Sequence, residues 1–342
     1  MNNPSQILVT GGTGYIGSHT AVELQQAGFE VVIVDNLSNS SIGVLDGIAR
    51  ITGRRPHFAQ VDCLDIDGLH RVFKEHPDIR AVIHFAAYKS VGESVQQPLL
   101  YYRNNLQSLL NLLEVMITQH VPNLVFSSSC TVYGQPEVLP VTENASTQPA
   151  ASPYGNTKQI SEEIIYDTVH SGAPVKSILL RYFNPIGAHP SAEIGELPLG
   201  VPQNLVPFIT QTAIGIREKL RVFGNDYKTP DGSCIRDYIS VVDLAKAHVT
   251  ACQRLLNNLS TDKVEVFNIG TGKGLSVLEL IHIFRKVTGI ALPYEIVGRR
   301  EGDIEQIWAD PHKANTVLGW TAKESIDDTL RSAWKWEQKD GL

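Results

Sequence analysis

The sequence predicts an α/β fold in which a doubly wound parallel β-sheet precedes a smaller mixed α/β domain. Short apolar runs alternate with amphipathic stretches of helical length through the first half of the chain. These runs are nearly continuous in apolar residues, as in strands that helices cover on both faces. After Phe183 the pattern changes to long segments rich in glycine and proline. A chain of 342 residues has the length for about two domains with ample buried core.

Each strand of the expected sheet corresponds to one apolar run. These runs are Ile7–Thr10, Glu30–Asp35, Ala81–Ala87, Asn123–Ser129 and Lys176–Phe183. Helices are expected between them at Ile16–Ala27, Leu64–Glu75, Leu99–His120 and Pro153–Ser171. Later in the chain, a helix is expected near Ser240–Asn257, and a strand at Val264–Gly270 could return to the sheet.

The second half of the chain contains two irregular segments, Asn184–Asn204 and Gly224–Cys234. Both are long for passive connectors, which indicates a functional role for them. Beyond them, Ser276 and Glu279 form a predicted capping box at the start of a helix. Gly289 is the expected end of that helix.

The composition excludes several classes of function. The formal net charge is −7 without a long basic block, so nucleic acid is not an expected partner. The histidines show no metal-binding pattern, and no metal site is expected. No run of about 18 apolar residues and no signal-peptide pattern occurs, so we expect a cytoplasmic protein without a membrane segment. A disulfide framework is not expected either, because no C-x-x-C pair occurs among Cys63, Cys130, Cys234 and Cys252.

Three glycines follow the first expected strand and lead into a helix, in the segment "LVTGGTGYIG". Gly11, Gly14 and Gly17 permit a tight turn, close approach of the backbone to a pyrophosphate, and close packing of the helix. Asp35 ends the second strand, where a carboxylate can accept hydrogen bonds from a ribose hydroxyl and repel a 2′-phosphate. This pattern predicts a Rossmann-like unit that binds NAD rather than NADP. A purely structural turn with a surface aspartate is the alternative.

A second motif, "SPYGNTK", begins the helix expected from Pro153. Ser152 is a good N-cap, and Tyr154 and Lys158 then lie one turn apart on one face. The end of the preceding strand brings Ser129 to the same edge of the sheet as the expected NAD. A neighbouring ammonium and a positive nicotinamide would lower the pKa of Tyr154, which could then accept a proton from an alcohol while Ser129 holds the oxygen. The Y-x-x-x-K spacing alone is also common on solvated helix faces.

Motifs along nearly the whole chain support this prediction. They are "VTGGTGYIGSHT", "VDNLSNS", "VIHFAAYKSVGESV", "YYRNN", "FSSSCTVYG", "SPYGNTK", "LLRYFNPIGAHP", "FGNDY", "RDYI" and "RREGD". With them the sequence resembles the UDP-glucose 4-epimerases (UDP-galactose 4-epimerases) of the extended short-chain dehydrogenase/reductase family. The resemblance implies a tightly held NAD that takes hydride from carbon 4 of a UDP-hexose. The 4-keto sugar then turns about its diphosphate linkage and receives the hydride on its other face, without net redox change.

The resemblance also implies roles for individual residues. The catalytic residues would be Ser129, Tyr154 and Lys158. The NAD site would comprise Gly11, Gly14, Tyr15, Ile16, Gly17, Asp35, Asn36, Leu37, Ser38, Asn39, Ser40, Asp62, Cys63, Phe85, Ala86, Ala87, Tyr88, Lys89, Asn104, Ser129, Tyr154, Lys158 and Phe183. The UDP-hexose site would comprise Lys89, Ser129, Thr131, Tyr154, Asn184, Asn204, Leu205, Arg221, Val222, Phe223, Arg236, Arg300, Asp303 and Ile307.

The implied domains interleave along the chain. Residues 1–183 and 237–269 would form the NAD-binding Rossmann domain, and residues 184–236 and 270–342 the nucleotide-sugar-binding domain. In the second domain, Arg236 and Arg300 would clamp the diphosphate, and Asp303 would accept hydrogen bonds from the uridine ribose. Surface ion pairing is the alternative for each arginine.

Two positions depart from the family pattern. Cys130 stands between Ser129 and Thr131 and is expected to be a packing residue rather than a nucleophile, since no base is evident beside it. Ile307 falls where family members vary in bulk beside sugar carbon 2, which leaves the acceptance of N-acetylated sugars open. Related 4,6-dehydratases carry an Asp-Glu pair where Cys130 and Thr131 stand, and decarboxylases usually carry Glu at the second position. Both activities are therefore less favoured.

Two further expectations concern the whole molecule. A non-catalytic NAD-binding scaffold is the alternative of a different class, and the intact serine, tyrosine and lysine set argues against it. We expect a homodimer in which Leu99–His120 and Ser152–Ser171 pair with their copies in a four-helix bundle, as the resemblance implies. Four leucines suit burial there but could equally face the chain's own sheet, namely Leu106, Leu109, Leu110 and Leu113.

Overall fold

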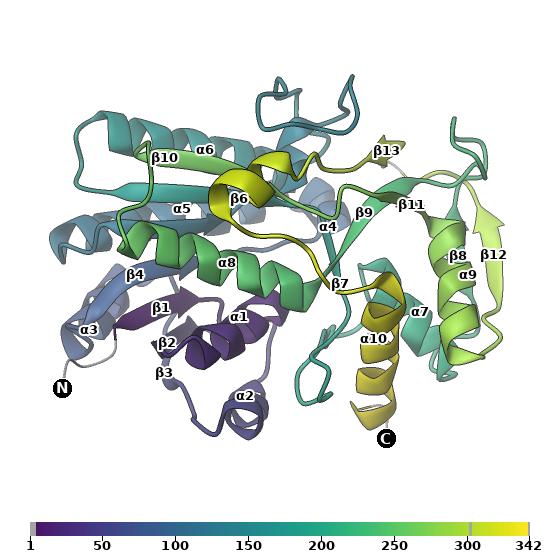
Figure 1. Cartoon of the computed structure of the whole chain (residues 1–342), viewed down its shortest axis with the longest axis horizontal. Coiled ribbons are helices and arrows are strands. Elements are labelled where there is room, and N and C mark those ends of the chain that lie inside the picture. The colour runs from purple at the N-terminus through teal and green to yellow at the C-terminus, as the bar shows by residue number, and fades with distance from the viewer. Residues whose placement is uncertain (1–4, 301–302, 341–342) are drawn as a thin grey trace.

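Among residues 5–300 and 303–340, which the computed structural model describes, seven parallel strands form the central sheet (Figure 1). Their order is β10-β6-β5-β4-β1-β2-β3, and every neighbouring pair is parallel. The strands are β1 Gln6–Thr10, β2 Glu30–Asp35, β3 His57–Gln60, β4 Ile79–His84, β5 Asn123–Ser127, β6 Lys176–Tyr182 and β10 Val264–Ile269. The chain runs outward in one direction from β1 and in the other from β4, so the topological switch point lies between these two strands.

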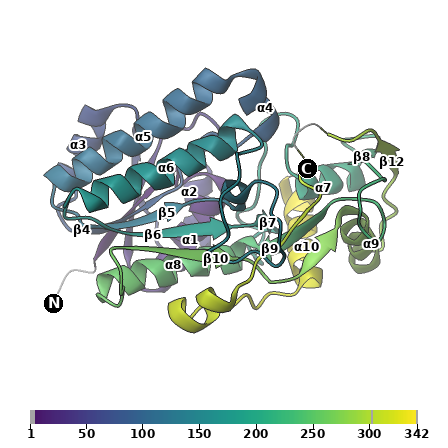
Figure 2. The same ribbon diagram turned by 90° about the horizontal axis from the view of Figure 1, so that it is seen from above.

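Helices cover both faces of this sheet (Figure 2). One face carries α1 Tyr15–Gln26, α2 Val44–Thr52 and α8 Val241–Leu256, and the other carries α3 Ile66–Glu75, α5 Pro98–Thr118 and α6 Pro153–His170. The short helix α4 Val91–Gln96 precedes α5. Each face of the sheet has its own hydrophobic core. Within β1, Ile7 and Val9 belong to the first core, under α1, α2 and α8, whereas Leu8 belongs to the second core, under α3, α5 and α6. This two-sided burial explains why the strands read as continuous apolar runs.

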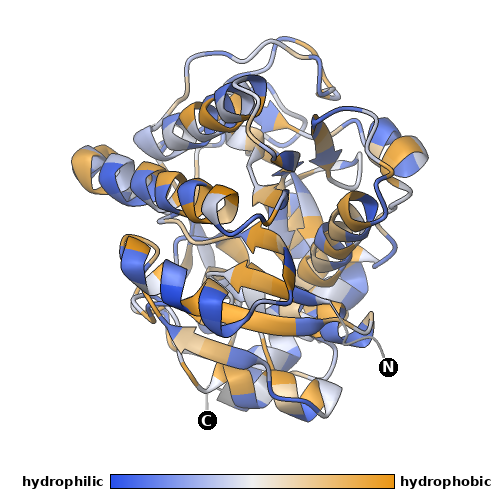
Figure 3. Cartoon of the chain, turned by 90° about the vertical axis from the view of Figure 1, so that its left-hand side faces the viewer, coloured by the Kyte–Doolittle hydropathy of each residue, from blue (hydrophilic) through white to orange (hydrophobic). Residues whose placement is uncertain are grey.

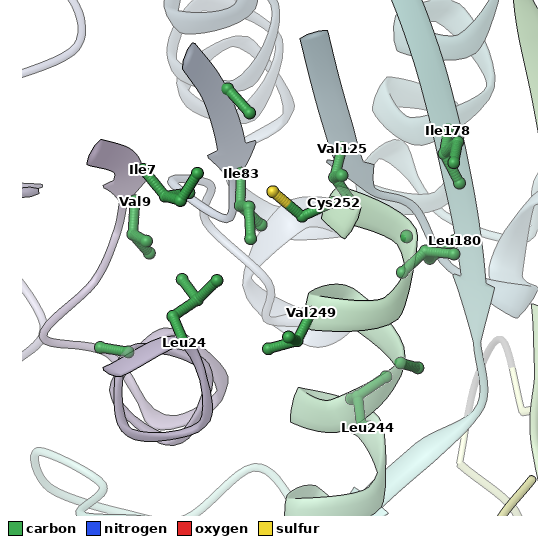
Figure 4. Packing of buried hydrophobic residues seen from close by; sticks show 14 of the residues in the cluster. Ile7, Val9, Leu24, Ile83, Val125, Ile178, Leu180, Leu244, Val249 and Cys252 are labelled. Atoms are coloured by element: carbon green, nitrogen blue, oxygen red, sulfur yellow. The ribbon is translucent and has the colours of Figure 1, made fainter. Parts of the chain in front are cut away.

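The first of these cores fixes α1 and α8 against the strands (Figure 4). Leu24 of α1 points toward Ile7 and Val9 of β1, and Val249 of α8 extends into the space between the two helices. Each such buried aliphatic side chain contributes about 1.5–3 kcal/mol to folding. Figure 3 shows that the strands are hydrophobic along much of their length. The helices on either side of them carry both hydrophobic and hydrophilic residues. The packing holds the start of α1 at the carboxyl ends of the strands.

A smaller unit lies at one end of the central sheet (Figure 1). Its four-stranded sheet comprises β7 Asn184–Ile186, β9 Ile235–Ser240, β11 Gly274–Ser276 and β13 Gln306–Ile307, and a separate pair comprises β8 Leu220–Phe223 and β12 Tyr294–Val297. The helices α7 Leu205–Ala213, α9 Val277–Thr288 and α10 Ile326–Asp340 pack on these strands. Their apolar side chains, among them Ile209, Phe284 and Leu330, form a core of their own.

The elements expected from the apolar runs are present, with ends that differ by at most three residues. The strand expected at Val264–Gly270 returns to the sheet as β10, beside β6. The capping box is present, because the Ser276 hydroxyl accepts from the Glu279 N–H at 3.0 Å and Glu279 Oε2 accepts from the Ser276 N–H at 2.7 Å. Gly289 ends α9 in the left-handed region. Among the described helices, none is both long enough and apolar enough to cross a membrane.

Other elements were not expected from the sequence. β3 is a short edge strand whose exposed His57 and Gln60 interrupt the apolar run. α2 and α4 lie in segments to which no element was assigned. The short strands of the smaller unit lie partly in the expected irregular segments, as β7 does within Asn184–Asn204, and strands of this length carry no detectable period. The domain boundary expected after residue 236 falls inside β9.

Candidate active site

A cleft of about 730 Å³ lies at the carboxyl ends of the central strands, beside the switch point. The glycine turn, the ends of β2 and β4, the start of α6 and the segment 195–204 line it. Most residues expected to bind NAD meet there, namely Gly11, Gly14, Tyr15, Ile16, Gly17, Asp35, Asn36, Ser38, Asn39, Ser40, Asp62, Cys63, Phe85, Ala86, Ala87, Tyr88, Lys89, Asn104, Tyr154 and Lys158. Leu37, Ser129 and Phe183 are not among the lining residues.

The glycine turn leaves no room for side chains at two of its positions. A Cβ on Gly17 would lie 2.3 Å from the Gly11 carbonyl oxygen, and a Cβ on Gly11 would lie 2.8 Å from the Ala86 backbone nitrogen. Gly11 also has φ of +68°, where a side chain would be strained. The start of α1, whose first N–H groups have no partner within the helix, therefore packs directly against the strand ends. This arrangement fits the pyrophosphate of a dinucleotide.

Asp35 lies at the end of β2, on the wall of the cleft. Its Oδ2 accepts from the Thr13 N–H at 3.1 Å. Its Oδ1 accepts from the Leu37 N–H at 2.9 Å and from the Ser40 hydroxyl at 3.2 Å. A carboxylate held in this way still has lone pairs for a ribose hydroxyl, whereas a phosphate would meet a second negative charge. The site thus fits NAD better than NADP.

Tyr154 and Lys158 lie one turn apart at the start of α6, as their spacing predicts. Ser152 caps this helix by accepting a backbone N–H at 3.2 Å. Tyr154 and Lys158 are only 7% and 5% exposed, and both line the cleft. Lys158 Nζ donates to the Ser127 carbonyl at 2.8 Å and lies 4.9 Å above the Phe126 ring. The alternative of a solvated helix face is therefore wrong for this pair.

Ser129 follows the end of β5 by two residues. Its hydroxyl oxygen accepts from the Thr131 N–H at 3.2 Å and caps the short 3₁₀ helix Cys130–Tyr133. Ser129 is buried, and its side chain lies near enough to Tyr154 to affect the pKa of that phenol. The fold thus brings the serine, the tyrosine and the lysine together beside the cleft.

Burial has opposite effects on the two titratable groups of this trio. It raises the pKa of Tyr154 well above that of a free tyrosine, and the nearby Ser129 side chain opposes the rise. It lowers the pKa of Lys158 to about 8, and the charge of Glu162 opposes the fall. The lowered Tyr154 pKa expected from the sequence is therefore not a property of the protein alone, because desolvation dominates. A phenolate and an ammonium formed together make a neutral pair, which favours joint charging of the two groups.

Three residues of the expected sugar-nucleotide site meet on the smaller unit. Arg236 Nη2 and Arg300 Nε each lie 3.7 Å from Asp303 Oδ1. Distances of this length leave guanidinium donors available for a diphosphate. Residues 301 and 302 of the RREGD motif lie outside the described residues.

Two further residues of that set lie on the wall of the cleft and share one partner. Lys89 Nζ and Asn204 Nδ2 both donate to Glu196 Oε1, at 3.1 and 2.6 Å. Glu196 also lines the cleft and was not expected from the sequence. An entering phosphate would therefore compete with a carboxylate for Lys89 and Asn204.

The remaining members of the set differ in accessibility. On β8, Arg221 and Phe223 are exposed, whereas the Val222 side chain is buried in the core of the smaller unit. Only the backbone of Val222 is therefore available to a ligand. Asn184 begins β7 and Leu205 begins α7, and both are half-buried.

Three residues singled out in the sequence share one apolar cluster. Cys130, Phe183 and Ile307 are buried there with Tyr133 and other residues. Burial raises the pKa of the Cys130 thiol to about 12, which agrees with a packing role rather than a nucleophilic one. Close by in the chain, the Thr131 hydroxyl oxygen is buried and has no hydrogen-bond partner among the described residues.

Asn105 organises the cleft, although the prediction includes only its neighbour Asn104. Asn105 Oδ1 accepts from the Tyr88 N–H at 2.8 Å, and Nδ2 donates to the Tyr88 carbonyl at 3.0 Å and to the Thr157 hydroxyl at 3.1 Å. It therefore joins α5 to the segment after β4 and to the first turns of α6. The YYRNN motif contains both asparagines, but the sequence does not show which one points inward.

Comparison with known proteins assigns the chain to a family. The model of a family described as GDP-mannose 4,6 dehydratase matches residues 8–333. The chain is 50% identical over 334 residues to the UDP-glucose 4-epimerase of Bacillus subtilis (strain 168), with 98% of this chain and 97% of that protein covered. The chain belongs to the UDP-glucose 4-epimerase family. It also matches a bifunctional protein GAL10 of Pachysolen tannophilus at 50% identity and spans 49% of that longer protein.

Solved UDP-glucose 4-epimerase structures have the same fold. The enzyme from Stenotrophomonas maltophila, with bound NAD and formylated UDP-arabinopyranose, gives a TM-score of 0.95 at 48% identity, over 98% of this chain and 99% of that one. The enzyme from Bifidobacterium longum, in complex with NAD+ and UDP, gives a TM-score of 0.94 at 46% identity with the same coverage. The predicted Rossmann-like sheet with a smaller mixed α/β unit is confirmed.

Proposed function

We propose that this protein interconverts UDP-galactose and UDP-glucose by inverting carbon 4 of the hexose, with NAD held in the cleft. The observation that carries the proposal is the buried Tyr154–Lys158 pair, beside a glycine turn and an Asp35 that fit a dinucleotide. Relatives that carry the epimerase name support the choice of substrate. NAD, when bound, supplies a hydride acceptor and donor at carbon 4, so the reaction has no net redox change.

The three catalytic residues would divide the proton transfer among them. Tyr154 would accept the proton of the 4-hydroxyl as hydride leaves carbon 4, and would return it after the sugar has turned. Ser129 would hold the oxygen, since its hydroxyl lies beside Tyr154. Lys158 would stabilise the phenolate, because an adjacent ammonium offsets the cost of a buried negative charge.

Cationic and amide side chains from both parts of the fold would bind the diphosphate. Arg236 and Arg300 offer forked donors, and Lys89 and Asn204 would exchange Glu196 for phosphate oxygens. The Thr131 hydroxyl, which is buried and has no hydrogen-bond partner among the described residues, supports a further polar contact. The remaining contacts that we propose for the sugar nucleotide are those of Thr131, Asn184, Leu205, Arg221, Phe223, Asp303 and Ile307, and of the Val222 backbone.

A 4,6-dehydratase is the second candidate, because the matching family model has that description. Elimination of water needs an acid and a base beside the sugar. Where related dehydratases carry an Asp-Glu pair, this chain offers only the protonated thiol of Cys130 and the hydroxyl of Thr131. Epimerisation is therefore the better fit.

The purified protein is expected to convert UDP-galactose to UDP-glucose without added cofactor, and to reach the same equilibrium from either sugar. Chromatography of the sugar nucleotides measures the conversion, and heat denaturation followed by chromatography identifies the released dinucleotide. A 4-keto-6-deoxy product would instead identify a dehydratase. Bound NAD without any conversion would favour the scaffold.

We also propose a homodimer formed through the exposed faces of α5 and α6. The four leucines considered above divide between two environments. Leu109 and Leu113 belong to the chain's own core, whereas Leu106 is half-buried and Leu110 is 43% exposed. Two such helices from each copy would form a four-helix bundle over these leucines.

Leu110→Glu is expected to weaken this dimer about 100-fold or more, because the variant buries a charge at the centre of the interface. Sedimentation across a range of protein concentrations measures the association. Leu259→Glu, at a position 59% exposed in the loop after α8, is the matched control and should remain dimeric. A monomeric wild type, or a Leu110→Glu variant that associates normally, would exclude this interface.

We propose a cytoplasmic location as well. All four cysteines are free and buried, namely Cys63, Cys130, Cys234 and Cys252. Free thiols suit a reducing compartment, in which disulfides are rare.

A further inference from the structure

A buried ion pair lies next to the proposed catalytic residues without lining the cleft. Arg181 of β6 donates from Nε to Glu162 Oε1 at 3.0 Å and from Nη2 to Glu162 Oε2 at 2.6 Å. Their side chains are 8% and 7% exposed. Buried pairs are costly to desolvate and often add little to stability, which indicates a role beyond stabilising the fold.

The pair holds both ends of the segment that carries Ser129. Glu162 Oε1 accepts from the Ser128 hydroxyl at 2.5 Å. Arg181 Nη1 donates to the Tyr133 hydroxyl at 3.1 Å, and the guanidinium lies 4.9 Å above the tyrosine ring. Ser128 directly precedes Ser129, and Tyr133 is the last residue of the 3₁₀ helix that Ser129 caps. The pair thereby fixes this segment against α6 and β6.

Glu162 also lies one turn beyond Lys158 on the same face of α6. Burial lowers the pKa of Lys158 to about 8, and the charge of Glu162 opposes that fall. Among the described residues, His84 of β4 and Tyr154 of α6 also lie near Lys158, and Tyr182 of β6 lies near Tyr154. Arg181 is paired with Glu162. Burial lowers the pKa of His84 to about 3 and raises the pKa of both phenols, so these three are neutral near pH 7. Glu162 is therefore the negative charge that acts on Lys158.

We propose that Glu162 and Arg181 are positioning residues for the epimerase reaction, which hold Ser129 against Tyr154 and set a negative charge beside Lys158. The inference rests on the proposed function, because the pair has no chemistry of its own. Proton transfer requires its groups within hydrogen-bond reach, and a buried pair held by several hydrogen bonds supplies that alignment.

Replacement of the pair by apolar residues of similar volume, Glu162→Leu with Arg181→Met, tests the proposal. Such replacements of buried pairs are often neutral or stabilising, so we expect the variant to fold. We expect KM and NAD content to be unchanged and kcat to fall by about 10- to 100-fold. The alkaline limb of the kcat profile should begin at lower pH, because Glu162 is the member of the pair whose charge raises the pKa of Lys158, and the variant removes that charge together with Arg181.

Two further variants sharpen this test. Ser128→Ala removes one hydrogen bond to Glu162 but keeps both charges, so kcat should fall while the alkaline limb stays in place. The matched control is the pair Arg254→Met with Glu265→Leu. Arg254 of α8 binds Glu265 of β10 through two hydrogen bonds of 2.7 and 2.8 Å, away from the cleft. The control should keep the wild-type kcat and pH profile.

Wild-type kcat with an unmoved alkaline limb in the apolar pair variant would overturn the proposal, and so would equal losses in the control pair. If the apolar pair variant does not fold, Ser128→Ala decides, and wild-type kcat there overturns the proposal. Failure of the proposed function is a distinct result, since the wild-type protein itself would then leave UDP-galactose unconverted.

Discussion

Tyr154→Phe is expected to keep its fold and its bound NAD and to lose nearly all turnover. The variant retains the buried aromatic ring and removes only the hydroxyl. General acid–base catalysis contributes about 10²–10⁴-fold, so kcat should fall by about 100- to 10,000-fold. The glycine turn and Asp35 are untouched, so the NAD content should equal that of the wild type. Steady-state kinetics and extraction of the dinucleotide measure both quantities.

Tyr166→Phe is the matched control for this prediction. Tyr166 lies about three turns further along α6, where its ring contacts His170 rather than the cleft. Loss of the same hydroxyl there should leave kcat at the wild-type value. Near-normal turnover of Tyr154→Phe would remove Tyr154 as the proton acceptor, and equal losses in both variants would indicate a general effect on α6.

Gly17→Ala is expected to lose NAD and stability together. The added Cβ would lie 2.3 Å from the Gly11 carbonyl oxygen and 2.8 Å from the Gly12 Cα, both of them backbone atoms. The start of α1 must therefore move away from the turn that forms the pyrophosphate cradle. Overpacking of this kind costs about 1–3 kcal/mol in the free energy of unfolding, and the displaced cradle should leave the purified variant largely free of NAD. Thermal unfolding and dinucleotide extraction check the two effects.

Gly43→Ala provides the comparison, since it lies in the same part of the fold. Its φ is −60°, and the nearest atom to an added Cβ is the Ser41 hydroxyl oxygen at 3.6 Å, an ordinary contact. This variant should retain wild-type stability and NAD content. A Gly17→Ala protein with the same melting temperature and NAD content as Gly43→Ala would show that the close approach of α1 to the turn is not required.

The central sheet is predictable from the sequence because both of its faces are buried. β2 is the clearest case, since every residue from Val31 to Val34 is buried and the run contains no polar interruption. β13 is the opposite case, because it has only two residues. Its surroundings depend on contacts from distant segments, such as the buried Asp237 carboxylate that accepts from the N–H groups of Thr271 and Ala309. Tertiary contacts of this kind leave no local pattern.

The site is predictable where residue type and spacing are themselves the chemical requirement. The glycine turn and the spacing of Tyr154 and Lys158 are of this kind, because one helical turn fixes their geometry. The hydrogen bond from Lys89 to Glu196 is not predictable in this way, since 107 residues separate the two. The pKa of Tyr154 also lies beyond the sequence, because the desolvation that raises it depends on the whole fold around the side chain.

Hydride is expected to leave carbon 4 of the hexose and to return to the same carbon within one site. The fate of deuterium placed at that carbon reports this transfer. The purified protein is incubated with UDP-galactose that carries deuterium at carbon 4, and the product is examined by mass spectrometry and NMR. We expect UDP-glucose that retains the label on carbon 4. Label on another carbon of the hexose, or its loss to solvent, would contradict this transfer.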